Sequence, residues 1–426
     1  MKDIKTTTTE IINKLQSKEI IERIDNYSER FYDEPRYFYF GTVLSSDYEN
    51  ILGMDYFYQS EQSIGVGISF DSPYQALIKS VMEAVERFSQ RSVPTEKIRY
   101  STVDTSEQKT SVFFQPQGFN SKLKSSQFGF IKGTDMITGK QAEVPSQYVY
   151  LDSYHTLTKH KEKLFAPDIS TGTAAGFDEE TVLMAGICEI VERDALMSLY
   201  LNSVPLHPID PQSLPFQHVR KIVNTCKRYL LTPYIFIIQT DLQIPVAMTI
   251  LVDTTGYGAA ISVGGGCSPD IEYAITHSIE ESLAFRFLIK RKMNELRTTK
   301  FSVKPHEIID NTYMQMYWSA LYKIKDLSFW IDQKPVPYKQ PENFVQNLSD
   351  FISLCQKKKI SLYNVDIAPD PVRKAGIVVN RAVMPALQPF YDDRTVPFIH
   401  KKRIQEVSAI YNKHTLTINH IPHPIP

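Results

Sequence analysis

The sequence predicts a mixed α/β protein. Its 426 residues are 42% hydrophobic, which is enough to bury a large core. Short β-prone runs alternate with helical patterns along the whole chain. One unit, a β-prone segment followed by a glycine turn and a long helix, occurs three times. Three similar helices with convergent polar faces would need to meet over a shared site, so we expect one main domain over 61–415. An N-terminal segment (1–60) is expected to pack on it, and a flexible C-terminal tail (416–426) to follow it.

The first unit is predicted to contain a helix from Ser72 to about Arg87. A serine before a proline is a favourable helix start, because the hydroxyl caps free N–H groups and Pro73 has no N–H to lose. Near the end of this helix, Glu83, Glu86 and Arg87 stand at positions i, i+3 and i+4. We therefore expect these three side chains to project from one side.

The second unit repeats the pattern at the same spacing. Asp178 is expected to cap a helix, and Glu189 follows it by eleven residues, the separation that the first unit also has between its cap and its first glutamate. Glu192 and Arg193 complete a second E-x-x-E-R. One such motif is typical of a solvated, salt-bridged helix face. Two copies at the same distance from their caps indicate a functional pair.

The third unit has the same order of elements but a different motif. Gly264-Gly265-Gly266 leads to a helix that carries Glu281 and Arg286. The other predicted elements are helices at 8–31, 216–230 and 343–357, strands at 37–43, 54–58, 234–238, 246–252, 257–263, 360–365 and 376–383, and a solvated loop at 152–167.

Composition excludes several classes of partner. With 47 basic and 48 acidic side chains, the net charge of −1 gives no bulk attraction to nucleic acid or a membrane surface. The longest apolar stretch, 233–252, is interrupted by polar residues and suits two strands. The N-terminus lacks the apolar core of a signal peptide, and the four cysteines form no C-x-x-C pair. We expect a cytoplasmic protein.

The paired glutamates favour a metal–nucleotide site. Two carboxylates ~4 Å apart repel by about 4 kcal/mol at an effective dielectric of ~20, so a cluster formed by two E-x-x-E-R helices needs cations. Oxygen ligands suit Mg²⁺, which is often completed by substrate phosphates, and arginines would neutralise the remaining phosphate charge. The chain has no G-x-x-x-x-G-K-[ST] motif, so a nucleotide would bind without a P-loop. His277 and Cys188 fit packing roles better than catalytic ones.

Taken together, these motifs resemble the YcaO family, and specifically its azoline-forming cyclodehydratases. The resemblance covers about 60–426. It rests on G-x-G-x-S followed by E-x-x-E-R, on S-T-G-T-A-A-G followed by E-x-x-E-R-D, on G-G-G followed by E-x-x-x-x-R, and on the final P-x-P-x-P. It implies a YcaO-like fold and a non-P-loop site for ATP and Mg²⁺.

The resemblance also implies roles for individual residues. The implied metal ligands are Glu83, Glu86, Glu189 and Glu192. The implied nucleotide-site residues are Arg87, Arg193, Glu281, Arg286 and Ser170. Pro426, at the end of the tail, is the implied catalytic base. The chain departs from the family pattern at Val66, where a lysine is common, and at Phe177 and Thr181, where some relatives have Asn and Glu.

The implied activity is ATP-dependent conversion of Cys, Ser or Thr residues of a ribosomal precursor peptide to thiazolines or (methyl)oxazolines. The implied partners are that peptide, a separate E1-like leader-binding protein and an FMN-dependent dehydrogenase, with a homodimer left open. Three alternatives remain: a YcaO enzyme that forms thioamides or amidines, a non-catalytic ATP-binding scaffold subunit, and a general ATP-dependent amide ligase. The proline tail argues against the first alternative and the intact motif pairs against the second. An amide ligase would be expected to have a different nucleotide fold and no terminal proline repeat.

Overall fold

The computed structural model describes residues 3–28, 34–53, 64–102, 112–113, 127–151, 162–296, 298, 301–308, 311–342, 344–391 and 397–425. The chain forms two compact units, each assembled from segments that are distant in sequence. Unit 1 comprises Met1–Phe31, Arg36–Ile190 and Leu348–Ala386, and unit 2 comprises Tyr32–Pro35, Val191–Asn347 and Leu387–Pro426. The single domain and the boundaries expected from the sequence stay predictions.

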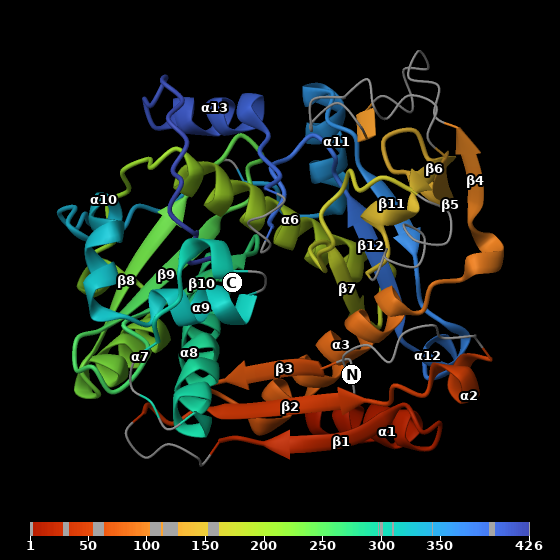
Figure 1. The fold of residues 1–426 in the computed structure, drawn as a ribbon, viewed down its shortest axis with the longest axis horizontal. Coiled ribbons are helices and arrows are strands. Elements are labelled where there is room, and N and C mark those ends of the chain that lie inside the picture. The colour runs from red at the N-terminus through yellow and green to blue at the C-terminus, as the bar shows by residue number, and fades with distance from the viewer. Residues whose placement is uncertain are drawn as a thin grey trace. The chain divides into compact units, whose positions relative to one another are not determined.

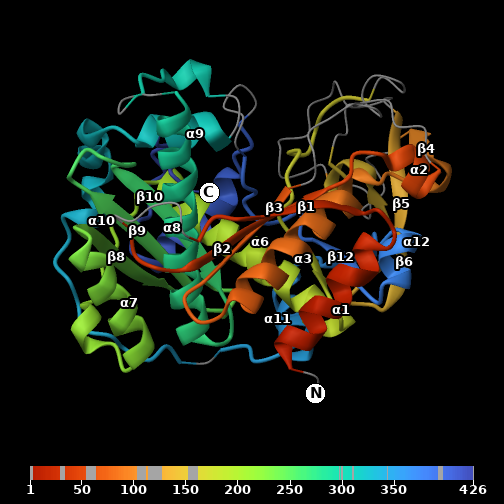
Figure 2. The ribbon, with the colours of Figure 1, turned by 90° about the horizontal axis from the view of Figure 1, so that it is seen from below.

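Unit 1 begins with a small antiparallel sheet covered by helices. The strands β1 (Ile21–Asn26), β2 (Phe38–Leu44) and β3 (Ile64–Ser69) pair in the order β1-β2-β3. Helix α3 (Pro73–Arg91) packs on β2 and β3, and α1 (Ile4–Gln16) lies beside α3 (Figure 2). The predicted cap is confirmed, because the Ser72 hydroxyl accepts from the N–H of Tyr74 at 3.2 Å.

The helix expected over 8–31 is wrong in its second half. Helix α1 ends at Gln16, and the isoleucine-rich segment after it forms β1. Ile21 and Ile24 pair with Leu44 and Thr42 of β2. β-Branched residues fit a pleated surface well, and here strand pairing outweighs the helical spacing.

A second, antiparallel sheet completes unit 1 (Figure 1). Its strand order is β4-β5-β11-β12-β7, with β6 added beside β5. The strands are β4 (Arg99–Thr102), β5 (Gln127–Asp135), β6 (Lys140–Pro145), β7 (Thr173–Gly176), β11 (Tyr363–Asp366) and β12 (Val378–Val383). The helices α2 (Tyr48–Leu52), α11 (Leu348–Lys358) and α12 (Asp370–Lys374) also belong to this unit. Helix α6 (Glu179–Leu201) starts in unit 1 and continues into unit 2.

Unit 2 contains an antiparallel sheet with α8 (Ile271–Glu295) packed on it (Figure 1). The strands β8 (Leu231–Ile238), β9 (Val246–Asp253) and β10 (Ile261–Cys267) pair in the order β10-β9-β8. Helix α7 (Gln217–Arg228) packs against β8. The other α-helices in the described part of unit 2 are α9 (Asn311–Trp318), α10 (Ser328–Ile331) and α13 (Lys401–Ile410).

The glycines expected in turns lie mostly inside strands. Gly65 is in β3, and a Cβ atom there would come within 2.1 Å of the backbone nitrogen of Ala84 in α3. Gly264 is in β10, and its Cβ would come within 2.2 Å of the carbonyl oxygen of Ser278 in α8. Glycine is required because helix backbone and strand backbone touch. The glycine-turn prediction is therefore wrong for the first and third units, although the order of strand and helix is confirmed.

The same hydroxyl contact ties strand to helix in both units. Thr42 Oγ1 of β2 lies 2.8 Å from Ser80 Oγ of α3, and Thr249 Oγ1 of β9 lies 2.7 Å from Ser278 Oγ of α8. The glycine opposite each threonine in the neighbouring strand is Gly65 in unit 1 and Gly264 in unit 2. The two strand–strand–helix motifs are thus structural repeats of one another.

Most other predicted elements are confirmed with small shifts. The helices expected at 216–230 and 343–357 are α7 and α11, and the strands expected at 37–43, 234–238, 246–252, 360–365 and 376–383 are β2, β8, β9, β11 and β12. The strand expected at 257–263 begins at Ile261 and includes the glycines. Residues 54–58 and most of the loop at 152–167 lie outside the described residues, but Glu162 in that loop is buried.

No helix among the described residues is long and apolar enough to span a membrane.

Candidate active site

In unit 1, the Glu83 carboxylate is held by backbone and side chain together. Its Oε2 accepts from the N–H of Val66 in β3 at 2.7 Å, and its Oε1 accepts from Arg87 Nη2 at 2.7 Å. Burial opposes the charge of Arg87, but the charge and hydrogen bond of Glu83 outweigh it and raise the pKa of the guanidinium. The E-x-x-E-R spacing therefore produces a fixed ion pair on α3.

Glu86, one helical turn later, is half-buried, like Glu83. Its Oε1 accepts from the N–H of Ala175 in β7 at 2.9 Å. Burial raises the pKa of Glu86 well above its usual value, and the negative charges of Glu83 and Glu189 raise it further. The sequence correctly predicted that these glutamates share a neighbourhood in which their charges repel.

Glu189 reaches the same neighbourhood from α6. Asp178 caps this helix as predicted, accepting from the N–H of Thr181 at 2.9 Å. Glu189 Oε2 accepts from the N–H of Gly172 at 2.9 Å, and Gly172 has a φ of +94° that favours glycine. The glycine segment before this helix thus does contain a real turn.

The unit 1 carboxylates fit Mg²⁺ by donor chemistry. The charges of the three glutamates repel one another, Arg87 pairs with Glu83 and interacts with the other two, and oxygen ligands suit this cation. Within the part of the chain that the structure describes, no group of three or more His, Cys, Asp and Glu side chains is arranged as a ligand set. The reason is visible in the contacts, since Glu83, Glu86 and Glu189 are each directed at a different backbone N–H.

Arg381 is a site residue that the sequence analysis missed. From β12 its guanidinium donates to the carbonyl oxygens of Ile169 and Ser170 and to Thr173 Oγ1. Burial lowers the pKa of Arg381 to about 10, although the charge of Glu189 opposes this shift. An arginine inside an otherwise apolar strand was the available signal. Ser170, predicted to contact nucleotide, is held through its carbonyl oxygen by this arginine.

In unit 2, Glu192, Arg193 and Glu281 come together. Arg193 Nε lies 3.6 Å from Glu192 Oε1, and Arg193 Nη2 lies 3.6 Å from Glu281 Oε1. The N–H of Gly265 donates to Glu281 Oε2, and a Cβ on Gly265 would lie 2.3 Å from Glu192 Oε1. Glu281 therefore occupies in unit 2 the place that Glu83 occupies in unit 1.

Two other predicted site residues lie elsewhere or outside the described residues. Arg286 is buried in unit 2, where its Nη1 lies 2.7 Å from Asp253 Oδ2 and its Nε 3.3 Å from Glu34 Oε1. Pro426 lies outside the described residues. Glu192 belongs to unit 2, so its predicted pairing with the unit 1 glutamates stays a prediction, as do the roles of Arg286 and Pro426.

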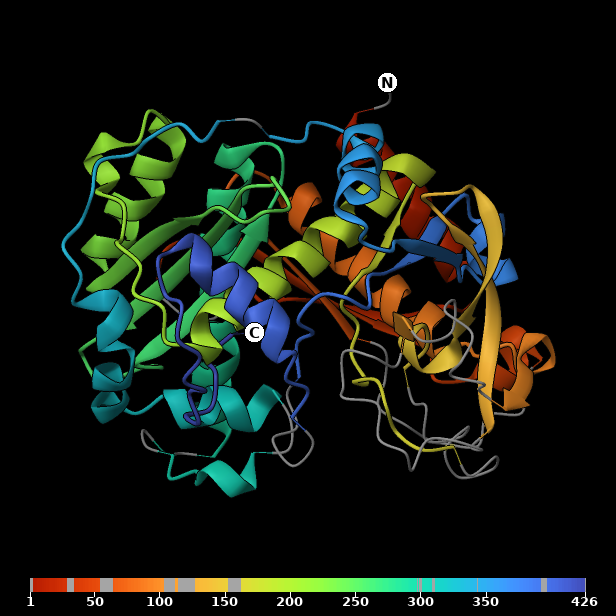
Figure 3. The same ribbon diagram turned by 90° about the horizontal axis from the view of Figure 1, so that it is seen from above.

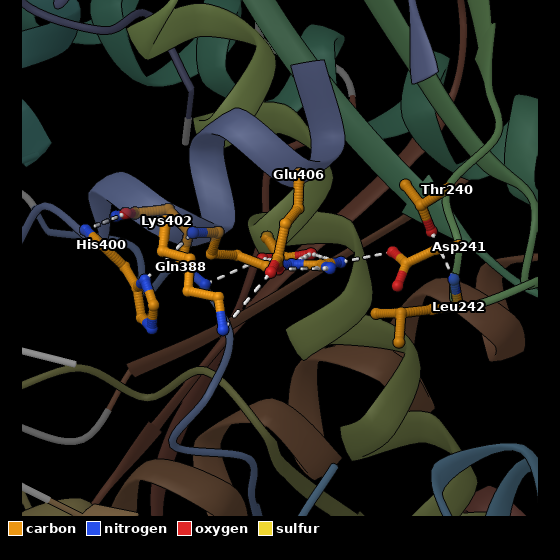
Figure 4. A network of polar contacts seen from close by, with 9 residues as sticks. Thr240, Asp241, Leu242, Gln388, His400, Lys402 and Glu406 are labelled. Carbon is orange, nitrogen blue, oxygen red and sulfur yellow. Dashed lines mark hydrogen bonds and ion pairs between the residues drawn. The ribbon is translucent and has the colours of Figure 1, made fainter. Parts of the chain in front are cut away.

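The residue after the second motif, Asp194, anchors the C-terminal segment within unit 2. Its Oδ1 accepts from the N–H of Gln388, and its Oδ2 accepts from Arg403 Nη2 of α13 at 2.6 Å. Arg403 also donates to Asp241, and the side chain of Gln388 accepts from the N–H of His400 (Figure 4). The chain beyond α13 then runs along the C-terminal part of α6 (Figure 3).

The fold and these residues define a class, namely mixed α/β proteins in which E-x-x-E-R helices hold buried and half-buried carboxylates. A family model described as a YcaO cyclodehydratase that binds ATP and Mg²⁺ matches residues 70–388. The chain belongs to the YcaO family. By this family assignment it is an enzyme that uses ATP and Mg²⁺.

Solved structures agree in fold. A heterocyclase in complex with substrate and cofactor matches at TM-score 0.67 and 15% identity over 97% of this chain and 57% of that chain. YcaO from Methanopyrus kandleri bound with AMPPCP and Mg²⁺ matches at TM-score 0.64 and 14% identity, covering 92% and 93%. The E. coli microcin synthetase McbBCD complex with pro-MccB17 bound matches at TM-score 0.62 and 12% identity, over 95% of this chain and 96% of that chain. The chain thus spans little more than half the length of the first heterocyclase. No curated protein matches it.

Proposed function

We propose that this enzyme converts Cys, Ser or Thr residues of a ribosomal precursor peptide to thiazolines or (methyl)oxazolines. The observation that carries the proposal is the half-buried cluster of Glu83, Glu86 and Glu189, built from both E-x-x-E-R motifs of a YcaO chain. The final Pro422-x-Pro424-x-Pro426 favours azoline formation over the thioamide and amidine chemistry of other family members.

The reaction needs an activated amide oxygen. The side-chain sulfur or oxygen of the peptide attacks the preceding amide carbonyl, and the resulting oxyanion takes the γ-phosphoryl group of ATP with release of ADP. Loss of phosphate and of the amide proton then leaves a C=N bond, so the peptide loses one water for each ATP consumed. Phosphorylation converts a poor leaving group into a good one. The enzyme's contribution is positioning and charge neutralisation.

The residues divide into two groups by their contacts. Glu83, Glu86, Glu189 and Glu192 are proposed to hold Mg²⁺, which would supply positive charge to the phosphates. An ionised carboxylate that accepts an N–H keeps further lone pairs, so the backbone contacts of Glu83, Glu86 and Glu189 can orient these ligands. We propose Arg87, Arg193, Arg286, Glu281 and Ser170 for the nucleotide.

The tail is proposed to serve the cyclisation step. A polyproline segment is stiff and has little conformational entropy to lose, so it can hold Pro426 near the peptide as a base. Support comes from residues 422–425, which are buried in unit 2.

The proposed partners follow from the chemistry and from similar proteins. One structural neighbour is a heterocyclase with substrate and cofactor, and another is a multiprotein microcin synthetase. We propose that this chain acts with a separate E1-like leader-binding protein on a precursor peptide in the cytoplasm. An FMN-dependent dehydrogenase would then oxidise the azolines to azoles.

Mass spectrometry tests the proposal. A cysteine-rich precursor peptide from the same gene neighbourhood is incubated with this protein, the E1-like partner and Mg·ATP. Losses of one water per modified residue, matched by ADP and phosphate, are expected. A gain corresponding to oxygen-to-sulfur exchange in the presence of a sulfur source would instead establish thioamide formation and overturn the proposal.

Two variants test the site assignment. Glu83→Ala should abolish Mg·ATP use while the protein remains folded. Removing the last five residues should leave ATP binding in place and abolish most cyclisation. Wild-type turnover in either variant would contradict the corresponding assignment.

A further inference from the structure

Arg381 of β12 is a charged side chain buried inside unit 1, and among the described residues its hydrogen bonds all go to neutral oxygens. Its Nε donates to the carbonyl oxygen of Tyr148 at 2.9 Å, and its Nη2 donates to that of Ile169 at 3.1 Å. Its Nη1 donates to the carbonyl oxygen of Ser170 and to Thr173 Oγ1. Three of these four acceptors are backbone atoms, so the guanidinium fixes the course of the main chain.

The backbone that Arg381 holds forms a turn around Gly172. The N–H of Thr173 donates to the carbonyl oxygen of Ser170 at 3.1 Å, and the N–H of Ala382 donates to the carbonyl oxygen of Gly172 at 2.8 Å. Gly172 has a φ of +94°, and a Cβ atom there would lie 2.6 Å from the carbonyl oxygen of Ala382. The turn is therefore held against β12 by a backbone hydrogen bond and by the side chain of Arg381 together.

The same segment presents the N–H groups that contact one glutamate from each of the two motif helices. The N–H of Gly172 donates to Glu189 Oε2 of α6, and the N–H of Ala175 donates to Glu86 Oε1 of α3, both at 2.9 Å. Ala175 lies in β7, the strand that pairs with β12 beside Arg381. Two N–H groups of one short segment thus set the directions of carboxylates that come from different helices.

We propose that Arg381 is a positioning residue, which holds this turn and thereby orients the carboxylates of Glu86 and Glu189 toward Mg²⁺. Its hydrogen bonds within the described part of the chain reach neither carboxylate, so its effect passes through the N–H groups of Gly172 and Ala175. The planar guanidinium suits this task, because it donates in several fixed directions at once, whereas a lysine ammonium is a compact point charge. The inference rests on the proposed role of these glutamates as metal ligands.

Calorimetry of the full chain with a non-hydrolysable ATP analogue, at varied free Mg²⁺, tests the inference. Arg381→Lys keeps the charge but cannot reach all four acceptors. The free Mg²⁺ concentration for half-maximal binding should therefore rise about 10- to 100-fold, the usual cost of losing a contact behind metal ligands. At saturating Mg²⁺ the affinity for the analogue should return towards that of wild type. A merely structural role would lower the urea midpoint and leave the Mg²⁺ dependence unchanged.

Arg373→Lys is the matched control in the same unit. The side chain of Arg373 is 54% exposed and pairs with Asp366 of β11. The substitution is chemically the same as in Arg381→Lys, but it does not touch the turn at Gly172. Its Mg²⁺ dependence should therefore be that of wild type.

Hydrogen exchange in EDTA tests the positioning without any ligand. The amides of residues 171–176 should exchange faster in Arg381→Lys than in wild type, and at the wild-type rate in Arg373→Lys. Unchanged exchange over this segment would overturn the inference. Faster exchange together with an unchanged Mg²⁺ dependence would overturn it as well, because the turn would then be irrelevant to the metal site.

Thr173→Val provides a milder test, because it removes one acceptor of Arg381 and keeps a β-branched side chain in β7. Its amide exchange and Mg²⁺ dependence should change in the same direction as in Arg381→Lys, by a smaller factor. If Arg381→Lys does not fold, this variant decides, and wild-type values in both measurements would contradict the inference. Wild-type protein that bound the analogue with Mg²⁺ but made no azolines would refute the proposed function and leave the role of Arg381 standing.

Discussion

Asp194 Oδ2 accepts from Arg403 Nη2 at 2.6 Å, and both side chains are almost completely buried, at 0% and 3% exposure. Burial opposes the charge of Arg403, yet Asp194 and Asp241 more than compensate and raise the pKa of the guanidinium. This pair joins α6, just after the second glutamate motif, to the helix that precedes the tail.

We expect Asp194→Asn to destabilise the protein by about 3–5 kcal/mol, because removal of one partner leaves a buried charge that Asp241 compensates only in part. Urea unfolding measures the loss. Lys402→Ala is the control, since this lysine is 82% exposed and its ion pair with Glu406 contributes little. Equal unfolding midpoints for Asp194→Asn and wild type would show that the pair is dispensable.

His400 should make stability depend on pH. The N–H of Arg403 donates to His400 Nδ1 at 3.1 Å, which requires this nitrogen to be unprotonated, and burial lowers the pKa of the ring. Below the usual value of 6.5, the unfolded chain binds the proton more readily than the folded one. The free energy of unfolding should therefore rise as pH increases from the lowered pKa to 6.5. This contribution to stability is lost again as pH falls from 6.5 through the lowered pKa. His400→Asn keeps a capping side chain, so its free energy of unfolding should vary less with pH between the lowered pKa and 6.5. An unchanged slope would contradict this role.

When Mg²⁺ is removed, Glu86 should make the free energy of unfolding depend on pH in the opposite direction to His400. Its pKa is raised by burial and by Glu83 and Glu189, so above the usual value of 4.5 the folded state binds a proton that the unfolded state has lost. The free energy of unfolding should then decrease as pH rises between 4.5 and the raised pKa. In EDTA, Glu86→Gln should lack this decrease, and Mg·ATP should stabilise wild type but not the variant. Urea titrations with and without Mg·ATP measure both effects.

The sequence predicted the helices of the site better than their contacts. Ser72 and Asp178 signal their helices by local rules, and the repeated glutamate spacing identified Glu83, Glu86 and Glu189 as neighbours. Local rules did not show that Gly65 and Gly264 serve helix–strand contact, because that depends on which backbone lies opposite.

The contacts that the sequence did not predict are mainly those between residues far apart in the chain. Arg403 and Asp194 are 209 residues apart in sequence, and Tyr200 and Pro422 are 222 apart. No periodicity or motif spacing reports a contact of this kind. The composition of the tail suggested flexibility, whereas its burial depends on aromatic partners elsewhere in unit 2.

Gly65→Ala should disturb the metal site through the backbone. The added Cβ would come within 2.1 Å of Ala84 N and 2.2 Å of Ser80 O, both backbone atoms of α3. The helix must move away from β3, which destabilises by about 1–3 kcal/mol and stretches the 2.7 Å bond between Val66 N and Glu83. We expect a lower urea midpoint together with weaker Mg·ATP binding.

The matched control for this variant is Gly139→Ala. Gly139 has a φ of +68° and no atom within 4 Å of an added Cβ, so the substitution introduces backbone strain of about 1–2 kcal/mol without a clash. Its Mg·ATP affinity should remain that of wild type, because the strain lies in the turn between β5 and β6. If both variants lost stability but neither lost affinity, close packing of α3 on β3 would be structural only. The fixed position of Glu83 would then not be what Mg·ATP binding requires.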